Sequence, residues 1–390
     1  MTSSDELPKS ILLPLLIGGV LLAACYGSTF MLADHLNLQG LDPTLAGSAV
    51  SAGILVTLGS AIFAGRLASR IGLVRSISIS AVLMALAMIS FSAAPIIPNA
   101  IFAGGVFLGT AWAVFYILAP LIVINMVTSS FRVKYLTFFS GAQMLGLGLS
   151  VPVSNLLIEK GILYSEIYAG LGALSFFSAI LFLQGSRGDR TQNNTASYTL
   201  TLAGTASIIS NSTVLPAMMI SLLACIFAGL ATFQSLYAEP LGLTPVTFFL
   251  TFTLVTVILR FGVASKIAKL PIYKLAIGLI LITMVSLGLF VINQGSVHLY
   301  VLASATFAVG YGLSYSTLNV IAVNIAEAKG LSIAASSQIF TLFYFVGIFG
   351  FPFIAGQLIA VSSVHTMLLS VIAVSVLALL IGIYLRVRVS

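Results

Sequence analysis

Charged side chains are scarce in this sequence, because only 6% of its 390 residues are Asp, Glu, Lys or Arg, whereas 59% are hydrophobic. A soluble domain typically carries about 25% charged residues, so the composition excludes a soluble globular protein. Disorder is excluded too, because it requires low hydrophobicity and high net charge. Two cysteines are too few for a disulfide framework or a four-cysteine metal site. Three histidines and nine carboxylates leave little material for acid–base or metal chemistry.

Long apolar stretches dominate the sequence instead. A helix that spans the hydrocarbon core of a bilayer, about 30 Å thick, needs about 20 apolar residues. Such stretches recur twelve times along the chain and are joined mostly by short links. The pattern predicts an all-α integral membrane protein with twelve transmembrane helices. Their expected positions are 11–32, 46–63, 76–92, 101–123, 135–157, 167–183, 214–236, 247–263, 275–293, 299–323, 332–358 and 366–385.

One link is much longer than the others and divides the helices into two groups of six. We therefore expect an N-terminal six-helix bundle over residues 1–184, a cytoplasmic central loop over 185–213 and a C-terminal six-helix bundle over 214–390. With both termini in the cytoplasm, 15 of the 16 Lys and Arg residues lie on the cytoplasmic side and only Lys160 lies outside, as the positive-inside rule requires. This distribution predicts a multi-pass protein of a bacterial inner membrane. The basic residues are spread over seven segments, so we expect no nucleic-acid partner.

The two groups of six helices share sequence features at a nearly constant offset of about 200 residues. Because each half has an even number of helices, both halves enter the membrane in the same orientation and form a parallel repeat. Two such halves can enclose a central cavity that opens to alternate sides of the membrane. The matching features include Leu13-Pro14 with Leu215-Pro216, Ala24-Cys25 with Ala224-Cys225, and Tyr116 and Asn125 with Tyr315 and Asn324.

The link between the second and third predicted helices, residues 65–75, reads GRLASRIGLVR. It resembles the Gly-x-Leu-Ala-Asp-Arg-x-Gly-Arg-Lys signature of the major facilitator superfamily. The helix number, the division into six and six, and the long central link are similar to this family as well. The resemblance implies two pseudo-symmetric six-helix bundles, and it assigns a role in conformational change to Gly65, Ser69, Arg70, Gly72 and Arg75.

Two departures from the family pattern concern charge. Ser69 stands where the family has an aspartate that helps to latch the outward-open state, and a serine carries no charge. Proton-coupled members often carry an arginine early in the fourth helix, and Gly105 holds that position here. The fourth predicted helix has no charged residue at all, so the usual proton-coupling group of that helix is missing.

The candidate substrate-binding residues are aromatic and amide side chains, because no charged residue lies near the centre of a predicted helix. A cavity for a strongly anionic solute would need a buried cation, and we expect none. Several candidates repeat at helical spacing, and the resemblance implies that helices 1, 4, 7 and 10 line the central path. Aromatic faces with a few amides suit an uncharged or amphipathic solute; helix packing is the alternative role for each residue. The set is Tyr26, Phe30, Trp112, Tyr116, Gln143, Gln234, Tyr237, Tyr311, Tyr315, Asn319, Gln338 and Tyr344.

Two carboxylates at the expected outer ends of the first and seventh helices, Asp34 and Glu239, are the candidates for proton coupling. The alternative is that both are rim residues in contact with water. The three histidines, His35, His298 and His365, are expected at the outer surface, where their spacing does not form a metal site.

Together these features predict a secondary active transporter that moves a small neutral or amphipathic organic solute by alternating access, with proton-coupled efflux as one mode. A facilitator or an importer of a sugar-like solute or other metabolite is the alternative, and a non-transporting receptor or sensor is the alternative of another class. The sequence has no Gly-Lys-Ser/Thr phosphate-binding loop, so ATP hydrolysis on this chain is excluded. We expect no enzymatic activity, no cofactor and no metal. The expected partners are a small-molecule solute, protons and the lipid bilayer, and the protein is expected to be a monomer.

Overall fold

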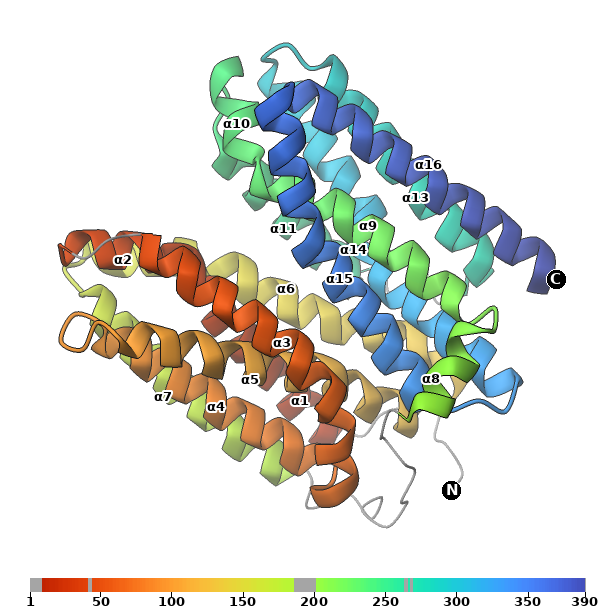
Figure 1. Ribbon diagram of the computed structural model, residues 1–390, viewed down its shortest axis with the longest axis horizontal. Coiled ribbons are helices and arrows are strands. Elements are labelled where there is room, and N and C mark those ends of the chain that lie inside the picture. Colours follow the sequence, from red (N-terminus) through yellow and green to blue (C-terminus); the bar gives the residue numbers. More distant parts are fainter. Residues whose placement is uncertain (1–8, 41–43, 186–200, 263–265, 267–268, 390) are drawn as a thin grey trace. The chain divides into compact units, whose positions relative to one another are not determined.

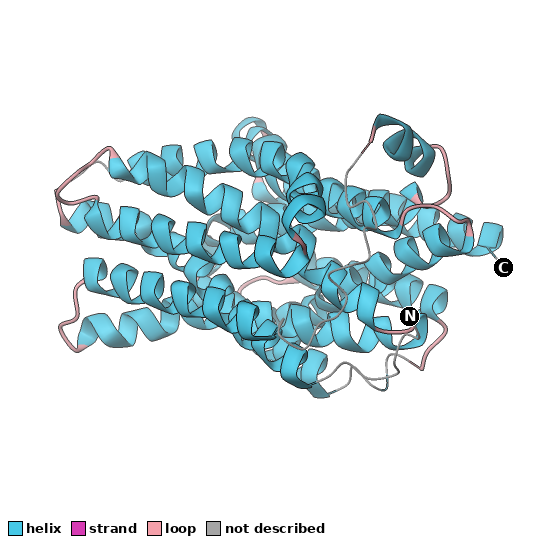
Figure 2. Cartoon of the chain, turned by 90° about the horizontal axis from the view of Figure 1, so that it is seen from below, coloured by secondary structure: helices cyan, strands magenta, loops and turns pink. Residues whose placement is uncertain are grey.

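The protein is described by a computed structural model that covers residues 9–40, 44–185, 201–262, 266 and 269–389. Within these ranges it consists of helices joined by loops and contains no β-strand (Figures 1 and 2). Helices of 18 residues or more coincide with all twelve predicted stretches, and ten of them are long and apolar enough to cross a membrane. The predicted all-α membrane fold is confirmed.

By their contacts, the residues form two compact units. The first comprises Met1–Thr128 and Phe138–Leu200, and the second comprises Ser129–Thr137 and Thr201–Ser390. The start of one long helix, α6, therefore groups with the second unit and its remainder with the first. The helices that lie wholly or mostly in the first unit are α1 (Lys9–Gly27), a 3-10 helix (Ser28–Met31), α2 (Leu32–Leu38), α3 (Thr44–Ile71), α4 (Leu73–Ala93), α5 (Ala100–Met126), α6 (Ser129–Glu159) and α7 (Tyr164–Gly185).

The second unit follows the same plan. Its helices are α8 (Leu202–Ile209), α9 (Val214–Thr232), α10 (Gln234–Ala238), a 3-10 helix (Glu239–Leu241), α11 (Pro245–Gly262), α13 (Ile272–Ile292), α14 (Val297–Ala328), α15 (Ile333–Val361) and α16 (Val364–Val389). The bundle boundaries expected from the sequence, 1–184, 185–213 and 214–390, stay a prediction.

Helix packing repeats between the two units. In the first, α4 packs on α5 and α7, α3 packs on α5, and α1 packs on α7. In the second, α13 packs on α14 and α16, α11 packs on α14, and α9 packs on α16. The equivalent helices pair in the same way, as the internal repeat in the sequence predicts. Among them α5 is almost entirely buried, and it is a central helix of its unit.

Glycine permits a close helix crossing in each unit. A Cβ added to Gly146 in α6 would overlap the backbone carbonyl of Val20 in α1, and one added to Gly347 in α15 would overlap that of Ser221 in α9. Both pairs are separated by the same 201 residues in the sequence. Small residues at helix interfaces let backbones approach closely in membrane proteins, so the repeat extends to backbone contacts.

The first long helix of each unit is interrupted near its C-terminal end. In the first unit α1 passes into the 3-10 helix Ser28–Met31 and then α2. In the second, α9 stops at Phe233, whose backbone leaves the helical region, and α10 follows. Interruptions of this kind occur at functional sites in membrane helices, because the backbone departs from the regular hydrogen-bond ladder there.

Candidate functional site

An aromatic stack joins α1 and α5 in the first unit. The rings of Tyr26 and Trp112 lie 4.4 Å apart between centroids, at an interplanar angle of 20°. Tyr116, one turn further along α5, lies 5.4 Å from Trp112. Three of the predicted residues are therefore together. The side chain of Phe30, predicted on the same face of the first helix, lies outside the described residues.

The second unit contains an equivalent stack between α9 and α14. Phe227 and Tyr311 are parallel within 3°, with centroids 4.7 Å apart. Tyr311 follows Trp112 by 199 residues, and Phe227 follows Tyr26 by 201. The sequence analysis identified Tyr311 and missed Phe227. The repeat offset applied to Tyr26 would have found it.

Polar side chains lie between α14 and α15 in the second unit. The hydroxyl groups of Tyr315 and Thr341 are 3.3 Å apart, and the ring of Tyr344 meets that of Tyr315 edge-on at 5.2 Å. Two turns away the Ser336 hydroxyl donates to the Ala322 carbonyl at 3.1 Å. These contacts set the register of the two helices.

This register places Asn319 of α14 at the level of Ser337 and Gln338 of α15. Asn319 is 0% exposed, and neither its Nδ2 nor its Oδ1 has a hydrogen-bond partner in the described structure. The hydroxyl of Ser337 is buried without a partner as well, and Gln338 is fully buried. These residues belong to a polar seam, which we define by Tyr315, Asn319, Ser337, Gln338 and Thr341. Buried polar groups are normally hydrogen-bonded, so Asn319 and Ser337 give the seam unused bonding capacity in the described structure.

A buried cation lies beside the seam, and the expectation that the protein has none was wrong. Arg260 of α11 is only 2% exposed, and its Nε donates to the Gly312 carbonyl of α14 at 2.8 Å. Its Nη2 donates to the same oxygen. The sequence placed Arg260 near the end of a predicted helix, where a long side chain usually reaches water. Packing against α14 closes that route.

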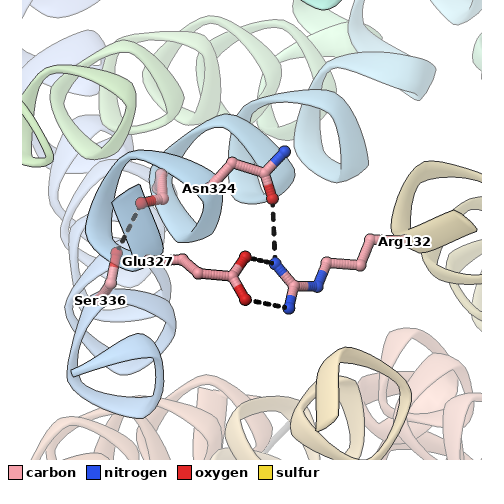
Figure 3. A network of polar contacts seen from close by, with 5 residues as sticks. Arg132, Asn324, Glu327 and Ser336 are labelled. Atoms are coloured by element: carbon pink, nitrogen blue, oxygen red, sulfur yellow. Dashed lines mark hydrogen bonds and ion pairs between the residues drawn. The ribbon is translucent and has the colours of Figure 1, made fainter. Parts of the chain in front are cut away.

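A second buried cation, Arg132, belongs to the start of α6 that groups with the second unit (Figure 3). Its side chain is bidentate to Glu327 of α14, with Nη1–Oε2 and Nη2–Oε1 distances of 2.6 and 3.1 Å. Nη1 also donates to the Asn324 Oδ1 at 3.0 Å. Arg132 is 5% exposed, and the Glu327 side chain is 46% exposed. The carboxylate therefore keeps contact with solvent while the guanidinium does not.

Three predicted amide and tyrosine residues have other neighbours. Gln143 of α6 is buried in the first unit, with its Nε2 unpartnered. Gln234 donates to the hydroxyl of Tyr300 at 2.7 Å, and Tyr237 donates to the carbonyl of Phe290 at 2.8 Å. The last two bonds tie α10 to the N-terminal part of α14 and the C-terminal end of α13, away from the register of the polar seam.

The coupling candidates and histidines fall in different surroundings. Glu239 is exposed, whereas the side chain of Asp34 lies outside the described residues. His298 and His365 are exposed, as expected. His35 is the exception, because it is 0% exposed and its Nε2 lies 3.1 Å from the carbonyl oxygen of Phe91. The expectation that His35 lies at the surface was wrong, because α2 turns it between α4 and α7.

The motif residues form a tight connection between α3 and α4. Gly72 has a φ of +90°, which glycine adopts at little cost. Gly65 is buried, whereas Ser69, Arg70 and Arg75 are exposed. The Ser69 hydroxyl donates to the Arg66 carbonyl at 3.0 Å, within its own turn. The position that carries the signature aspartate therefore offers neither charge nor a bond to another helix in the described structure.

Most of the chain is similar to known proteins. The family model described as Major Facilitator Superfamily matches residues 15–347. The fucose:proton symporter FucP of E. coli has a TM-score of 0.73 at 14% identity, covering 96% of this chain and 98% of that one. FucP in the outward conformation has a TM-score of 0.74 at 16% identity, covering 97% and 99%.

A third solved structure is the proton:xylose symporter XylE bound to 6-bromo-6-deoxy-D-glucose. It has a TM-score of 0.70 at 17% identity and covers 95% of this chain and 94% of that one. At such identities the similarity establishes the fold alone. A comparison with curated protein sequences finds no match.

Proposed function

Because the chain belongs to the major facilitator superfamily and is a multi-pass membrane transporter, we propose that it imports a small, hydroxyl-rich, sugar-like solute together with protons. The observation that carries this proposal is the unpartnered amide of Asn319 in the polar seam. A buried amide without partners costs about 1–3 kcal/mol. A solute hydroxyl, which both donates and accepts, offsets that cost at either amide atom.

The surroundings of the seam support the same chemistry. The ring of Tyr344 meets that of Tyr315 edge-on, and the Tyr315 hydroxyl lies 3.3 Å from that of Thr341. Ligand sites commonly combine apolar walls with a few polar groups that fix orientation. Two of the similar solved structures are a fucose:proton symporter and a proton:xylose symporter. That similarity supports the choice of sugar-like solutes for the first test.

The test is a thermal-shift screen of the purified protein against neutral monosaccharides, followed by calorimetric titration of any that stabilises it. Asn319→Ala should weaken binding 10- to 100-fold, since about 1.4 kcal/mol corresponds to tenfold. Ser314→Ala is the matched control, because that buried α14 hydroxyl bonds within its own helix, to the Gly310 carbonyl at 2.7 Å. Parental affinity in Asn319→Ala would remove the seam from the binding site.

Direction and coupling need a separate measurement. Proteoliposomes with an inward proton gradient should accumulate the stabilising solute, and collapsing the gradient should abolish accumulation. A second candidate function, export of an amphipathic compound, is favoured by the stacked pairs Tyr26–Trp112 and Phe227–Tyr311. Stabilisation by flat aromatic compounds but by no monosaccharide, together with gradient-driven extrusion of such a compound in the transport assay, would select export.

We also place both termini and the central loop in the cytoplasm of a bacterium, on the strength of the 15-to-1 partition of basic residues. A cysteine introduced at Ser197 should resist membrane-impermeant maleimides in intact cells and react after permeabilisation. Equal labelling before and after permeabilisation would reverse this orientation.

A further inference from the structure

In both units a side chain contacts the backbone carbonyl at the C-terminal end of a neighbouring helix, but the residue type differs. In the first unit the His35 Nε2 lies 3.1 Å from the carbonyl oxygen of Phe91, at the C-terminal end of α4. In the second unit the Tyr237 hydroxyl donates to the carbonyl of Phe290, at the C-terminal end of α13, at 2.8 Å. Phe290 follows Phe91 by 199 residues, and Tyr237 follows His35 by 202. The same helix-end carbonyl is thus held by a histidine in one unit and by a tyrosine in the other.

The histidine brings a second nitrogen that the tyrosine does not have. A carbonyl oxygen only accepts, so Nε2 carries the hydrogen and Nδ1 carries a lone pair. Nδ1 is buried without a hydrogen-bond partner in the described structure. The rings of Tyr164 and Tyr168 of α7 lie 5.8 and 5.3 Å from the imidazole, and Tyr168 is itself anchored by a hydroxyl bond to the Ser28 carbonyl at 2.9 Å.

The elements around His35 bring few ionisable groups. The facing parts of α4 and α3, residues 76–93 and 44–65, have no charged residue. Helix α7 brings the two tyrosines, and its Glu166 is exposed and accepts a bond from the Leu163 backbone N–H. On α2 itself the neighbour is Asp34, whose side chain lies outside the described residues. Burial lowers the pKa of His35 from 6.5, and the bond to Phe91 partly opposes this.

We propose that His35 is a proton-binding site that opens with the contact between α2, α4 and α7. While these helices are packed, the imidazole is neutral. When they separate, water reaches Nδ1, whose lone pair takes a proton from hydronium and leaves a water molecule and an imidazolium. Repacking returns that proton to water. Acid therefore shifts the population toward the open contact, independently of any solute.

The size of the effect follows from linkage. For an open-state imidazole with an ordinary pKa of about 6.5, the limiting case is a packed state that binds no proton. In that limit, opening is favoured about tenfold more at pH 5.5 than at pH 7.5, and any proton binding in the packed state makes the factor smaller. Because the pKa of His35 is lower in the packed state than in the open state, protonation favours opening. The packed state therefore keeps its full stability above about pH 6.5 and loses population as the pH falls.

Hydrogen–deuterium exchange on the full-length protein in detergent tests this without a solute. Peptides covering α2 should exchange up to about tenfold faster at pH 5.5 than at pH 7.5, after correction for intrinsic rates. His35→Gln, which retains a donor for the Phe91 carbonyl, should abolish the difference. His35→Tyr, which copies the second unit, is the second variant if the glutamine protein does not fold.

The repeat supplies matched controls. Tyr237→Phe should leave the acid response of α2 unchanged, whereas Tyr237→His should create one in α10. Proton NMR should show a histidine with a depressed titration midpoint that is absent in His35→Gln. Absence of any acid response at α2 in the parent, or a response that survives in both His35 variants, overturns the proposal.

Discussion

The first and second units share three contacts and differ in what surrounds them. Both have a stacked ring pair, Tyr26–Trp112 in one and Phe227–Tyr311 in the other. Both have a glycine crossing, made by Gly146 and by Gly347. Both also have a side chain that contacts the backbone carbonyl at a helix end, His35 at Phe91 in one and Tyr237 at Phe290 in the other. These contacts repeat because they hold helices together, and the duplicated halves need the same helix geometry.

The polar chemistry is unequal. The second unit contains the buried guanidinium groups of Arg260 and Arg132 and the unpartnered amide of Asn319. The described part of the first unit has no buried guanidinium group; it has the imidazole of His35 and the buried amide of Gln143, whose Nε2 is unpartnered. The repeat therefore conserves the scaffold while the two units carry different polar side chains. We propose solute recognition for the seam and proton binding for His35 of α2.

The largest expected effect tests the shared scaffold. Gly146→Ala and Gly347→Ala each force a Cβ into a backbone carbonyl that cannot move away cheaply, so each should cost ~3 kcal/mol of stability and sharply reduce the amount of folded protein. Size-exclusion profiles and thermal unfolding measure this. Gly350→Ala, which meets open space on α15, should behave as the parent. An effect in only one of the two crossings would break the equivalence of the units.

The next largest effect concerns the buried cations of the second unit and tests how much the Arg132–Glu327 ion pair contributes to stability. Glu327→Gln removes the carboxylate from the buried guanidinium of Arg132, and a hydrogen bond to a charged group contributes about 2 kcal/mol. Denaturant or thermal unfolding should show this loss. The double variant Arg132→Gln, Glu327→Gln should recover part of it, because no buried charge is left alone. Strict additivity would mean that the ion pair contributes nothing.

A smaller effect concerns the helix-end carbonyls. Tyr237→Phe leaves the Phe290 carbonyl without its donor and should cost about 1 kcal/mol. Burial raises the pKa of Tyr237 above 10, although the nearby Asn293 side chain partly opposes this, so the phenol stays protonated between pH 5 and 8. The stability difference between parent and variant should therefore be constant over that range. If the stability difference between parent and Tyr237→Phe changed with pH, Tyr237 would not be the pH-independent counterpart of His35.

The smallest expected effect comes from exchanging the ring pairs. Phe227→Tyr gives the stack of the second unit the tyrosine of the first, and the ring area that contacts Tyr311 stays the same. Stability should change by less than about 0.5 kcal/mol, since ring stacking itself contributes only about 0.5–1.5 kcal/mol. Thermal unfolding of the parent and of Phe227→Tyr, each at two scan rates, measures this difference. A large loss would show that the Phe227 position tolerates no hydroxyl, so the two stacks would differ in their surroundings.

The polar seam could be predicted only in part. Asn319, Gln338 and Tyr315 stood out in the sequence because amides and tyrosines at helical spacing are conspicuous among apolar residues. Ser337 did not, since serine is common in membrane helices. The burial of Arg260 could not be predicted either, because it depends on Gly312, 52 residues further along the chain.

The sequence alone determined the twelve helices and the repeat. Hydrophobic length and composition are local properties of each segment, and the thickness of the bilayer sets the length that a spanning helix needs. The tertiary structure decided which helix-end side chains face water. His35 and Glu239 both lie near the ends of predicted helices, yet one is enclosed by α4 and α7 and the other is exposed. Burial at a helix end depends on neighbours distant in the sequence, and these neighbours set the charge state and chemistry of the residues found there.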